Sequence, residues 1–258
     1  IMLHYFCFKN SNKDVSWLTF IHGAGGNSSI WSQQIRFFKN FYHLLLIDLR
    51  GHGKSISHEF DEIYTFENVT EDIIKVLDKE AIKKSHFVGI SLGSILIRKI
   101  VDSHPERMSK LVLAGAILNL NLRSKILMYL GKMTQSILPF IWIYSFFAHV
   151  ILPYRNHRKS RQFFIREAKK LSHEEFLRWY RLTNDLVPYL EDFRKKMIRI
   201  PTLYIMGSQD YMFLPFVKKN VAKDKSTSLL VLNKCGHVVN IEKPNEFNEG
   251  MLHFLQFD

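Results

Sequence analysis

The hydrophobic positions of this chain follow two alternating patterns. Short apolar runs bounded by turn residues predict strands. Apolar residues that recur every three or four positions predict helices, as Val69, Ile73, Val76 and Leu77 do. The predicted strands are residues 3–8, 15–21, 42–48, 85–89, 110–114, 202–206 and 228–232, and the predicted helices are 66–81, 92–103 and 245–257.

This alternation indicates an α/β protein with a mostly parallel sheet flanked by helices. It is interrupted between residues 116 and 199, where the pattern is mostly helical and rich in aromatic and aliphatic residues. We therefore predict an α/β core formed by residues 1–115 and 200–258, with residues 116–199 as an inserted helical lid. A chain of 258 residues suits one domain of this kind.

The segment Gly89-Ile90-Ser91-Leu92-Gly93 lies between a predicted strand and a predicted helix. That context is typical of a nucleophile elbow, a strained turn that exposes a serine hydroxyl and requires small neighbours. The backbone N–H of Leu92 opens the helix, where developing negative charge is favoured. Such a pentapeptide also arises by chance, so its position between strand and helix favours the catalytic interpretation of Ser91.

A serine nucleophile needs a base and a group that orients the base. His237 follows the last predicted strand, and Asp210 follows the strand before it. Catalytic groups of open parallel sheets gather at the carboxyl ends of strands. A histidine could equally be structural, and Asp210 could only cap a turn. The chain order Ser91, Asp210, His237 favours a triad, because it is the order of α/β-hydrolases and not of other serine-hydrolase folds.

Several segments together resemble the α/β-hydrolase superfamily, in particular its small carboxylesterase and lactonase-like members. They lie within residues 15–115 and 200–258, and the predicted lid resembles nothing that we can name. The matching segments are residues 20–26, 47–55, 88–94, 201–210, 236–237 and 241–244.

The resemblance implies an oxyanion hole formed by the backbone N–H groups of Ala24 and Leu92. Ala24 lies in a glycine-rich loop, residues 22–26, whose glycines let the backbone turn sharply. A phosphate-binding loop is the alternative, but the lysine of a P-loop and the spacing of a dinucleotide fingerprint are missing. Residues 48–55 contain Asp, Arg, His and Ser, and we interpret them as a structural turn in which Arg50 forms a local ion pair.

By resemblance, the chain is a serine hydrolase that cleaves an ester, thioester or lactone through an acyl-enzyme on Ser91. The mechanism requires no cofactor and no metal. Epoxide hydrolases and haloalkane dehalogenases carry an aspartate where this chain has Ser91, which argues against both. A carbon–carbon bond hydrolase, a synthase or lyase, and a ligand receptor or signalling protein with residual hydrolase activity remain as alternatives.

Aromatic residues cluster in the predicted lid and directly after Asp210. They predict a pocket for an apolar acyl group, so that the partner would be a small apolar ester. The alternative is that they pack the lid onto the core. The predicted pocket residues are Trp142, Phe146, Tyr211, Met212 and Val238.

The net charge of +12 does not by itself identify a partner. No nucleic-acid module accompanies the scattered Lys and Arg residues, and we interpret the basic residues 155–170 as a solvated helix face. Residues 137–153 are too short and too interrupted to span a membrane. A peripheral membrane contact through the lid is a further hypothesis.

Location and assembly are less well defined by the sequence. Cys7 and Cys235 show no metal-ligand spacing and are expected to be free thiols in a reducing compartment. The first residues lack the pattern of a signal peptide, and we expect a cytoplasmic location. The sequence leaves the oligomeric state undefined.

Overall fold

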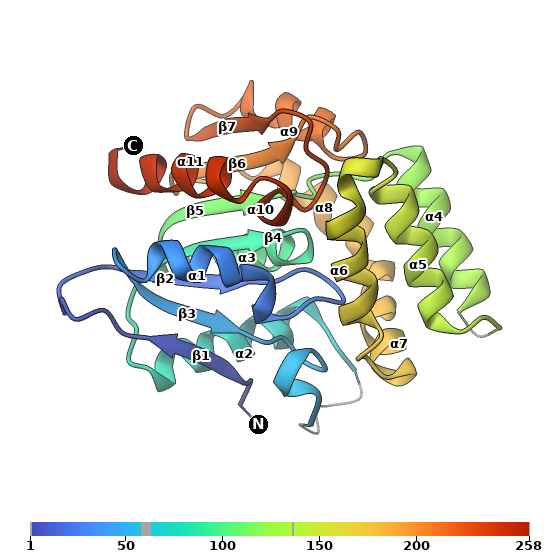
Figure 1. Ribbon diagram of the computed structural model, residues 1–258, viewed down its shortest axis with the longest axis horizontal. Coiled ribbons are helices and arrows are strands. Elements are labelled where there is room, and N and C mark those ends of the chain that lie inside the picture. The colour runs from blue at the N-terminus through green and yellow to red at the C-terminus, as the bar shows by residue number, and fades with distance from the viewer. Residues whose placement is uncertain (1, 58–62, 136, 258) are drawn as a thin grey trace.

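A seven-stranded sheet forms the centre of the computed structural model, which describes residues 2–57, 63–135 and 137–257 (Figure 1). The strand order is β1-β3-β2-β4-β5-β6-β7. Strands β2 to β7 pair in parallel, and β1 pairs antiparallel with β3. The mostly parallel sheet predicted from the sequence is therefore confirmed. The strands are β1 (Tyr5–Phe8), β2 (Trp17–Ile21), β3 (His43–Ile47), β4 (Ser85–Ile90), β5 (Met108–Ala114), β6 (Thr202–Gly207) and β7 (Thr227–Leu232).

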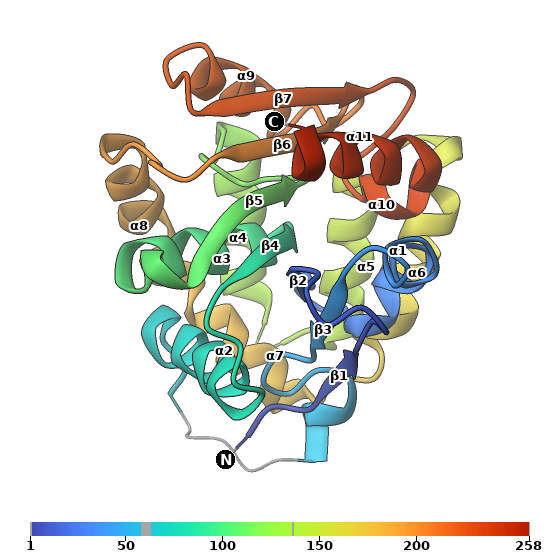
Figure 2. The same ribbon diagram turned by 90° about the vertical axis from the view of Figure 1, so that its left-hand side faces the viewer.

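Helices cover both faces of the sheet (Figure 2). One face carries α1 (Ser32–Phe38) and α11 (Pro244–Phe257), and the other carries α2 (Phe66–Lys79), α3 (Leu92–Ser103) and α9 (Leu214–Val221). The shorter elements are α10 (Val239–Glu242) and the 3-10 turns η1 (Ser28–Trp31), η2 (Gly53–Ser57), η3 (Pro105–Arg107) and η4 (Arg155–His157).

Burial on both faces explains why the central strands are continuous apolar runs. In β3, Leu44 and Leu46 join the core beneath α1 and α11, whereas Leu45 and Ile47 join the core beneath α2 and α3. Successive side chains of a strand point to opposite faces, so a strand covered on both sides has no solvent-facing position. All five residues of β3 are buried.

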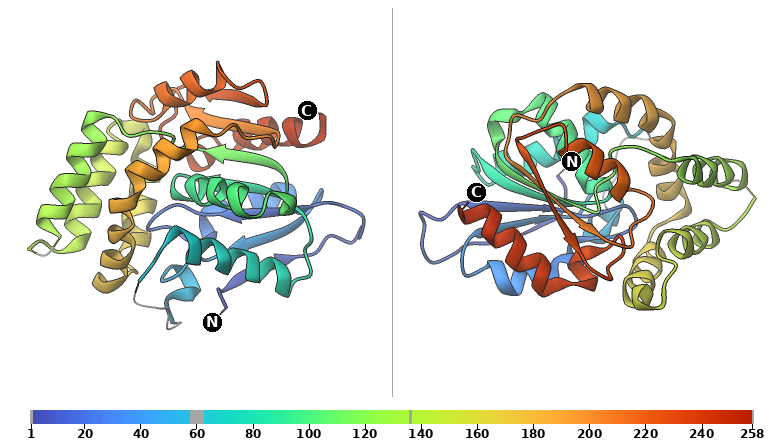
Figure 3. Two further views of the ribbon diagram at one scale, coloured as in Figure 1. Left: turned by 180° about the vertical axis from the view of Figure 1, so that it is seen from behind. Right: turned by 90° about the horizontal axis from the view of Figure 1, so that it is seen from above.

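Between β5 and β6, the described residues form five α-helices, which lie beyond the carboxyl ends of the parallel strands (Figures 1 and 3). They are α4 (Leu122–Thr134), α5 (Phe140–Ile151), α6 (Arg158–Ala168), α7 (His173–Arg181) and α8 (Thr183–Lys195). We call them the inserted helices. That they act as a lid, with the boundaries given above, stays a prediction. Residues 1, 58–62, 136 and 258 of those ranges lie outside the described part of the chain.

Three helices of the described chain were not predicted from the sequence, namely α1, α9 and the four-residue α10. Helix α1 has seven residues and α9 has eight, and each offers too few turns for helical periodicity to stand out. The predicted helix 92–103 agrees with α3 at both ends. Within the described residues, no helix combines the length and apolar character needed to cross a membrane.

Candidate active site

Ser91 lies at the turn between β4 and α3, at the carboxyl edge of the sheet. Its backbone has φ 54° and ψ −115°, a strained conformation for a residue other than glycine. The turn brings α3 so close to β2 that a Cβ on Gly93 would lie 2.4 Å from the carbonyl oxygen of Ile21. A Cβ on Gly89 would lie 2.5 Å from Ile97. Close packing around Ser91 therefore requires glycine on both sides.

His237 and Asp210 come together as the sequence predicted. Nδ1 of His237 lies 2.7 Å from Oδ2 of Asp210, and both side chains are buried. A carboxylate only accepts hydrogen bonds, so Nδ1 is the donor and Nε2 keeps its lone pair. The backbone N–H of Phe213 donates to Oδ1 of Asp210 at 3.3 Å, and the Phe213 ring packs on the imidazole. These contacts fix the orientation of His237.

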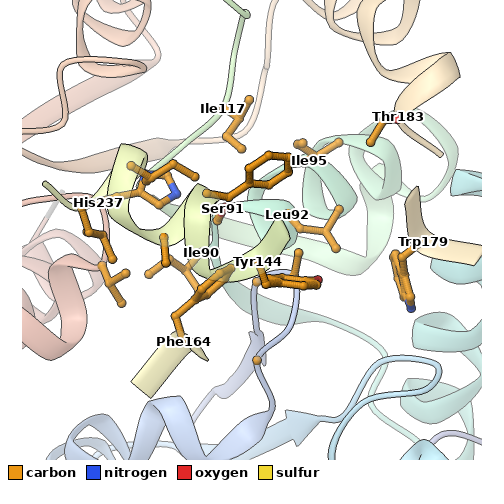
Figure 4. Close-up of a pocket in the computed structure, with 18 of the residues that line it drawn as sticks. Ile90, Ser91, Leu92, Ile95, Ile117, Tyr144, Phe164, Trp179, Thr183 and His237 are labelled. Carbon is orange, nitrogen blue, oxygen red and sulfur yellow. The ribbon is translucent and has the colours of Figure 1, made fainter. Parts of the chain in front are cut away.

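Ser91 and His237 line one cavity of about 250 Å³ between the sheet edge and the inserted helices (Figure 4). Tyr144, Phe164 and Trp179 line it from the inserted helices. No Lys, Arg, Asp or Glu is among the described residues that line this cavity. The cavity thus joins a serine and a histidine to an apolar space.

Ala24, in the loop after β2, and Leu92, directly after Ser91, also line the cavity. Leu92 is the first residue of α3, and the first N–H groups of a helix have no partner within the helix. The loop that carries Ala24 approaches Ser91 so closely that a Cβ on Gly23 would lie 3.2 Å from the Ser91 Cβ. Both residues therefore lie at the cavity wall near Ser91, and the oxyanion-hole role of their N–H groups stays a prediction.

Two buried histidines brace the Ala24 loop. His22 accepts a hydrogen bond from the N–H of Leu49 at Nε2, and its Nδ1 lies 2.8 Å from the Gly23 carbonyl oxygen. His52 accepts one from the N–H of Gly25 at Nε2, 3.0 Å away. Burial lowers the pKa of both side chains, and burial together with the nearby His22 lowers the pKa of His52 to about 3. Both rings therefore act as neutral hydrogen-bond acceptors.

The turn at residues 48–55 is structural, as the sequence analysis indicated. Asp48 accepts hydrogen bonds from the N–H groups of Ser28 at 2.8 Å and Lys54 at 3.0 Å. Arg50 forms a buried ion pair with Asp72 of α2, with Nε and Oδ2 2.5 Å apart. These contacts hold the turn against η1 and α2.

Comparison with known proteins identifies the family of this chain. Residues 20–249 match the model of the alpha/beta hydrolase family. The chain belongs to this family. It is therefore a hydrolase, and the bond that it cleaves is considered below.

Individual relatives of this alpha/beta hydrolase carry several names. The chain is 24% identical to a putative carbamate hydrolase, RutD, of Acinetobacter baylyi, covering 98% of both chains. It is also 24% identical to 3-oxoadipate enol-lactonase 2 of the same organism, covering 97% of this chain and 92% of the relative. The crystal structure of the enol-lactonase from Burkholderia xenovorans superposes with a TM-score of 0.79 at 19% identity, covering 98% of this chain and 96% of the other.

The predicted pocket of this alpha/beta hydrolase needs correction. Val238 lines the cavity, but Trp142, Phe146, Tyr211 and Met212 are not among the lining residues. Trp142 and Phe146 lie on the exposed side of α5. The Tyr211 hydroxyl donates to the carbonyl of Val150, and Met212 belongs to the core. Aromatic content alone could not tell which side of each element faces the cavity.

The lining residues of α5 were missed, because nearly every position of this helix is apolar. Tyr144, Phe147, Ala148 and Ile151 all line the cavity. Their spacing of i, i+3, i+4 and i+7 defines one face of a helix. The exposed residues Trp142 and Phe146 are also spaced by one helical turn, so periodicity alone does not distinguish the cavity face from the exposed face.

Buried carboxylates attach the inserted helices to the body, and no local sequence pattern indicated them. Glu167 of α6 accepts a hydrogen bond from Nδ2 of Asn27, 2.6 Å away in the loop after β2. Burial alone would raise the pKa of Glu167, but hydrogen bonds from Lys170, Arg166 and Asn27 hold it below its usual value. Glu242 accepts bonds from the Ser160 hydroxyl at 3.0 Å and the N–H of Gly236 at 2.7 Å. These contacts join α6 to the loops that carry Ala24 and His237.

No group of three or more His, Cys, Asp or Glu residues in the described ranges is placed to hold a metal ion. Cys7 and Cys235 are both free. Burial raises the pKa of the Cys235 thiol and keeps it protonated. The described part of the chain therefore offers Ser91, and not a thiolate, as the nucleophile at the cavity.

Proposed function

We propose that this alpha/beta hydrolase cleaves a neutral carboxylic ester with an apolar acyl group through an acyl-enzyme on Ser91. The observation that carries the proposal is the 2.7 Å contact between His237 and Asp210 beside a strained Ser91 at the wall of an apolar cavity. A serine hydroxyl becomes nucleophilic when a correctly oriented imidazole can take its proton.

The proposed reaction has two halves. Ser91 Oγ attacks the carbonyl carbon while Nε2 of His237 takes the hydroxyl proton, and the alcohol leaves with that proton. A water molecule then attacks the acyl-enzyme, with His237 again as base, and releases the acid and free Ser91. Asp210 stabilises the imidazolium, and the N–H groups of Ala24 and Leu92 stabilise the oxyanion of each tetrahedral intermediate.

The cavity supports an uncharged substrate. A carboxylate or ammonium buried in it would lose its hydration without finding an oppositely charged side chain among the described lining residues. The volume of about 250 Å³ is slightly below the ~300–1,000 Å³ of pockets for drug-sized ligands, which favours acyl groups of short to medium length. Two relatives, named as a putative carbamate hydrolase and an enol-lactonase, support hydrolysis at a carbonyl carbon.

The first test is hydrolysis of p-nitrophenyl esters, from acetate to palmitate, by the wild type and by Ser91→Ala. We expect turnover with an optimum at short to medium chains and a loss of about 10⁴-fold or more in Ser91→Ala. Ser103→Ala, a change to an exposed serine at the other end of α3, is the matched control and should keep full activity. No turnover on any chain length by folded wild type would overturn the ester proposal and favour a carbon–carbon hydrolase, a synthase or a receptor.

A second test examines whether the substrate must be uncharged. Methyl hexanoate and monomethyl adipate present esters of similar length, and only the second carries a carboxylate. We expect kcat/KM to favour methyl hexanoate by about 100-fold, because the carboxylate would be buried without a partner. Equal rates on the two esters would contradict the assignment of a neutral substrate.

A further inference from the structure

Helices α4 and α5 carry apolar residues on their outward sides as well as on the sides that face the body. On α4, Leu127 and Gly131 are buried, while Met128 lines the cavity. The exposed apolar residues of α4 have the spacing i, i+4, i+7, i+8 and i+11, which is one helix face. They are Leu122, Ile126, Tyr129, Leu130 and Met133.

Further exposed apolar residues follow α4 in the chain, in the turn after it and on α5. Ile137 is 79% exposed, and Trp142 is 64% exposed on α5. Phe146, one helical turn after Trp142, is also exposed. We call the outward sides of these two helices the α4–α5 face, formed by Leu122, Ile126, Tyr129, Leu130, Met133, Ile137, Trp142 and Phe146.

The two helices stand side by side at the end of the molecule farthest from the strands (Figures 1 and 3). Both helices therefore leave large apolar side chains exposed to solvent in this structure. Large exposed apolar surfaces of this kind mark interaction sites.

The chain segment that carries the α4–α5 face has charged residues of one sign. Residues 117–166 contain no Asp or Glu and eight Lys or Arg residues, which are Arg123, Lys125, Lys132, Arg155, Arg158, Lys159, Arg161 and Arg166. Arg123, Lys125 and Lys132 belong to α4 itself and are exposed. None of these three forms an ion pair with a described residue, although Lys132 donates to Asn184 and Arg123 lies over the ring of Tyr211.

We propose that the α4–α5 face docks the protein on the surface of an anionic lipid bilayer. Apolar side chains with a tryptophan and a tyrosine enter the boundary between headgroups and acyl chains, and flanking lysine and arginine bind anionic headgroups. No described helix could span a membrane, so the contact is peripheral. A second copy of the chain fits this face less well, because a two-fold contact would place Lys and Arg against Lys and Arg.

The orientation of the contact follows from the neighbouring helices. Acidic residues return at α7 and α8, with Glu174, Asp185 and Glu191. Anionic headgroups repel these carboxylates, so the bilayer contacts α4 and α5 rather than the whole end of the molecule.

The test is flotation with lipid vesicles, using Ser91→Ala so that no lipid is consumed and the result does not depend on the proposed esterase activity. The vesicles are phosphatidylcholine alone or phosphatidylcholine with phosphatidylglycerol. We expect binding that increases about tenfold or more with the anionic lipid. The emission of Trp142 should shift to the blue, and Trp142→Phe should remove most of that shift.

Matched variants separate docking by this face from general attraction of a basic protein. Arg123→Gln/Lys125→Gln/Lys132→Gln should lose about tenfold or more in vesicle binding, whereas Lys218→Gln/Lys219→Gln/Lys223→Gln, with the same charge change near α9, should lose much less. Leu122→Gln/Ile126→Gln should also weaken binding, and Met197→Gln, at another exposed apolar site, should not.

Three results would overturn the proposal. The first is a lack of binding to anionic vesicles, and the second is equal loss from the two triple-charge variants. The third is a stable dimer by light scattering that Leu122→Gln/Ile126→Gln converts to monomer, which would assign the face to a second copy.

Discussion

At the scale of single residues, Asp210 contributes to the proposed chemistry only through His237, because its carboxylate contacts the imidazole and not the cavity. We expect Asp210→Asn to lower kcat by about 10³–10⁴-fold, since an amide can donate to Nδ1 and hold the wrong tautomer. Steady-state hydrolysis of the best p-nitrophenyl ester measures this loss.

Asp224→Asn is the matched control for Asp210→Asn. Asp224 is also buried and accepts bonds from Ser226, but it precedes β7 and so lies at the opposite edge of the sheet. We expect activity close to that of the wild type. Similar losses of activity from both aspartate variants would mean that Asp210 has only a structural role.

The buried His52 leads to a prediction about pH. Its pKa is about 3 in the folded protein and about 6.5 when unfolded, so between these values only the unfolded state binds the proton. Stability is therefore complete above pH ~6.5 and falls as the pH decreases, with a slope of up to about 1.4 kcal/mol per pH unit from this residue. Urea unfolding at a series of pH values measures the slope.

We expect His52→Gln to have a shallower slope than the wild type, because glutamine can still accept the bond from Gly25 but does not titrate. The exposed His149→Gln should leave the slope unchanged. Identical slopes for wild type and His52→Gln would show that His52 does not stay neutral in the folded protein.

At the scale of elements, α5 has one face toward the cavity and one toward solvent. Ala148 lines the cavity and is buried. We expect Ala148→Leu to shorten the preferred acyl chain, raising KM for octanoate more than for acetate, because the added carbons occupy part of the cavity. Kinetics across the p-nitrophenyl ester series measure this shift.

Phe146→Ala changes the opposite face of the same helix and should leave the chain-length preference unchanged for soluble esters. If Ala148→Leu also leaves the preference unchanged, the acyl group does not occupy the α5 side of the cavity. A general loss of rate on all esters by Ala148→Leu would instead indicate overpacking, which costs about 1–3 kcal/mol in a filled core.

At the scale of the whole molecule, the inserted helices depend on buried polar contacts with the body. Glu167→Ala would leave Nδ2 of Asn27 buried without its acceptor. We expect a loss of about 1–3 kcal/mol in the free energy of unfolding, measured in urea. Glu246→Ala, which removes an exposed carboxylate paired with Lys243, should change stability by less than about 0.5 kcal/mol. Equal effects of the two variants would mean that the contact with Asn27 stabilises nothing.

Much of the fold could be predicted from the sequence because local patterns report it. The predicted strands overlap all seven strands of the sheet, and the helix predicted at about residues 92–103 coincides with α3. The antiparallel direction of β1 had no such signal, since a strand's direction depends on its partner. Ser91, Asp210 and His237 could be selected because each follows a strand, and the carboxyl ends of parallel strands meet at one edge.

The sequence by itself determined the order of strands and helices, the glycines around Ser91 and the chain order of Ser91, Asp210 and His237. Only the tertiary structure decided which apolar residues face the cavity, because Tyr144 and Trp142 are equally aromatic and differ only in the side of α5 that they occupy. It likewise decided that Glu167 meets Asn27, 140 residues away in the chain. Local periodicity reports burial within an element, whereas contacts between distant elements depend on how those elements pack.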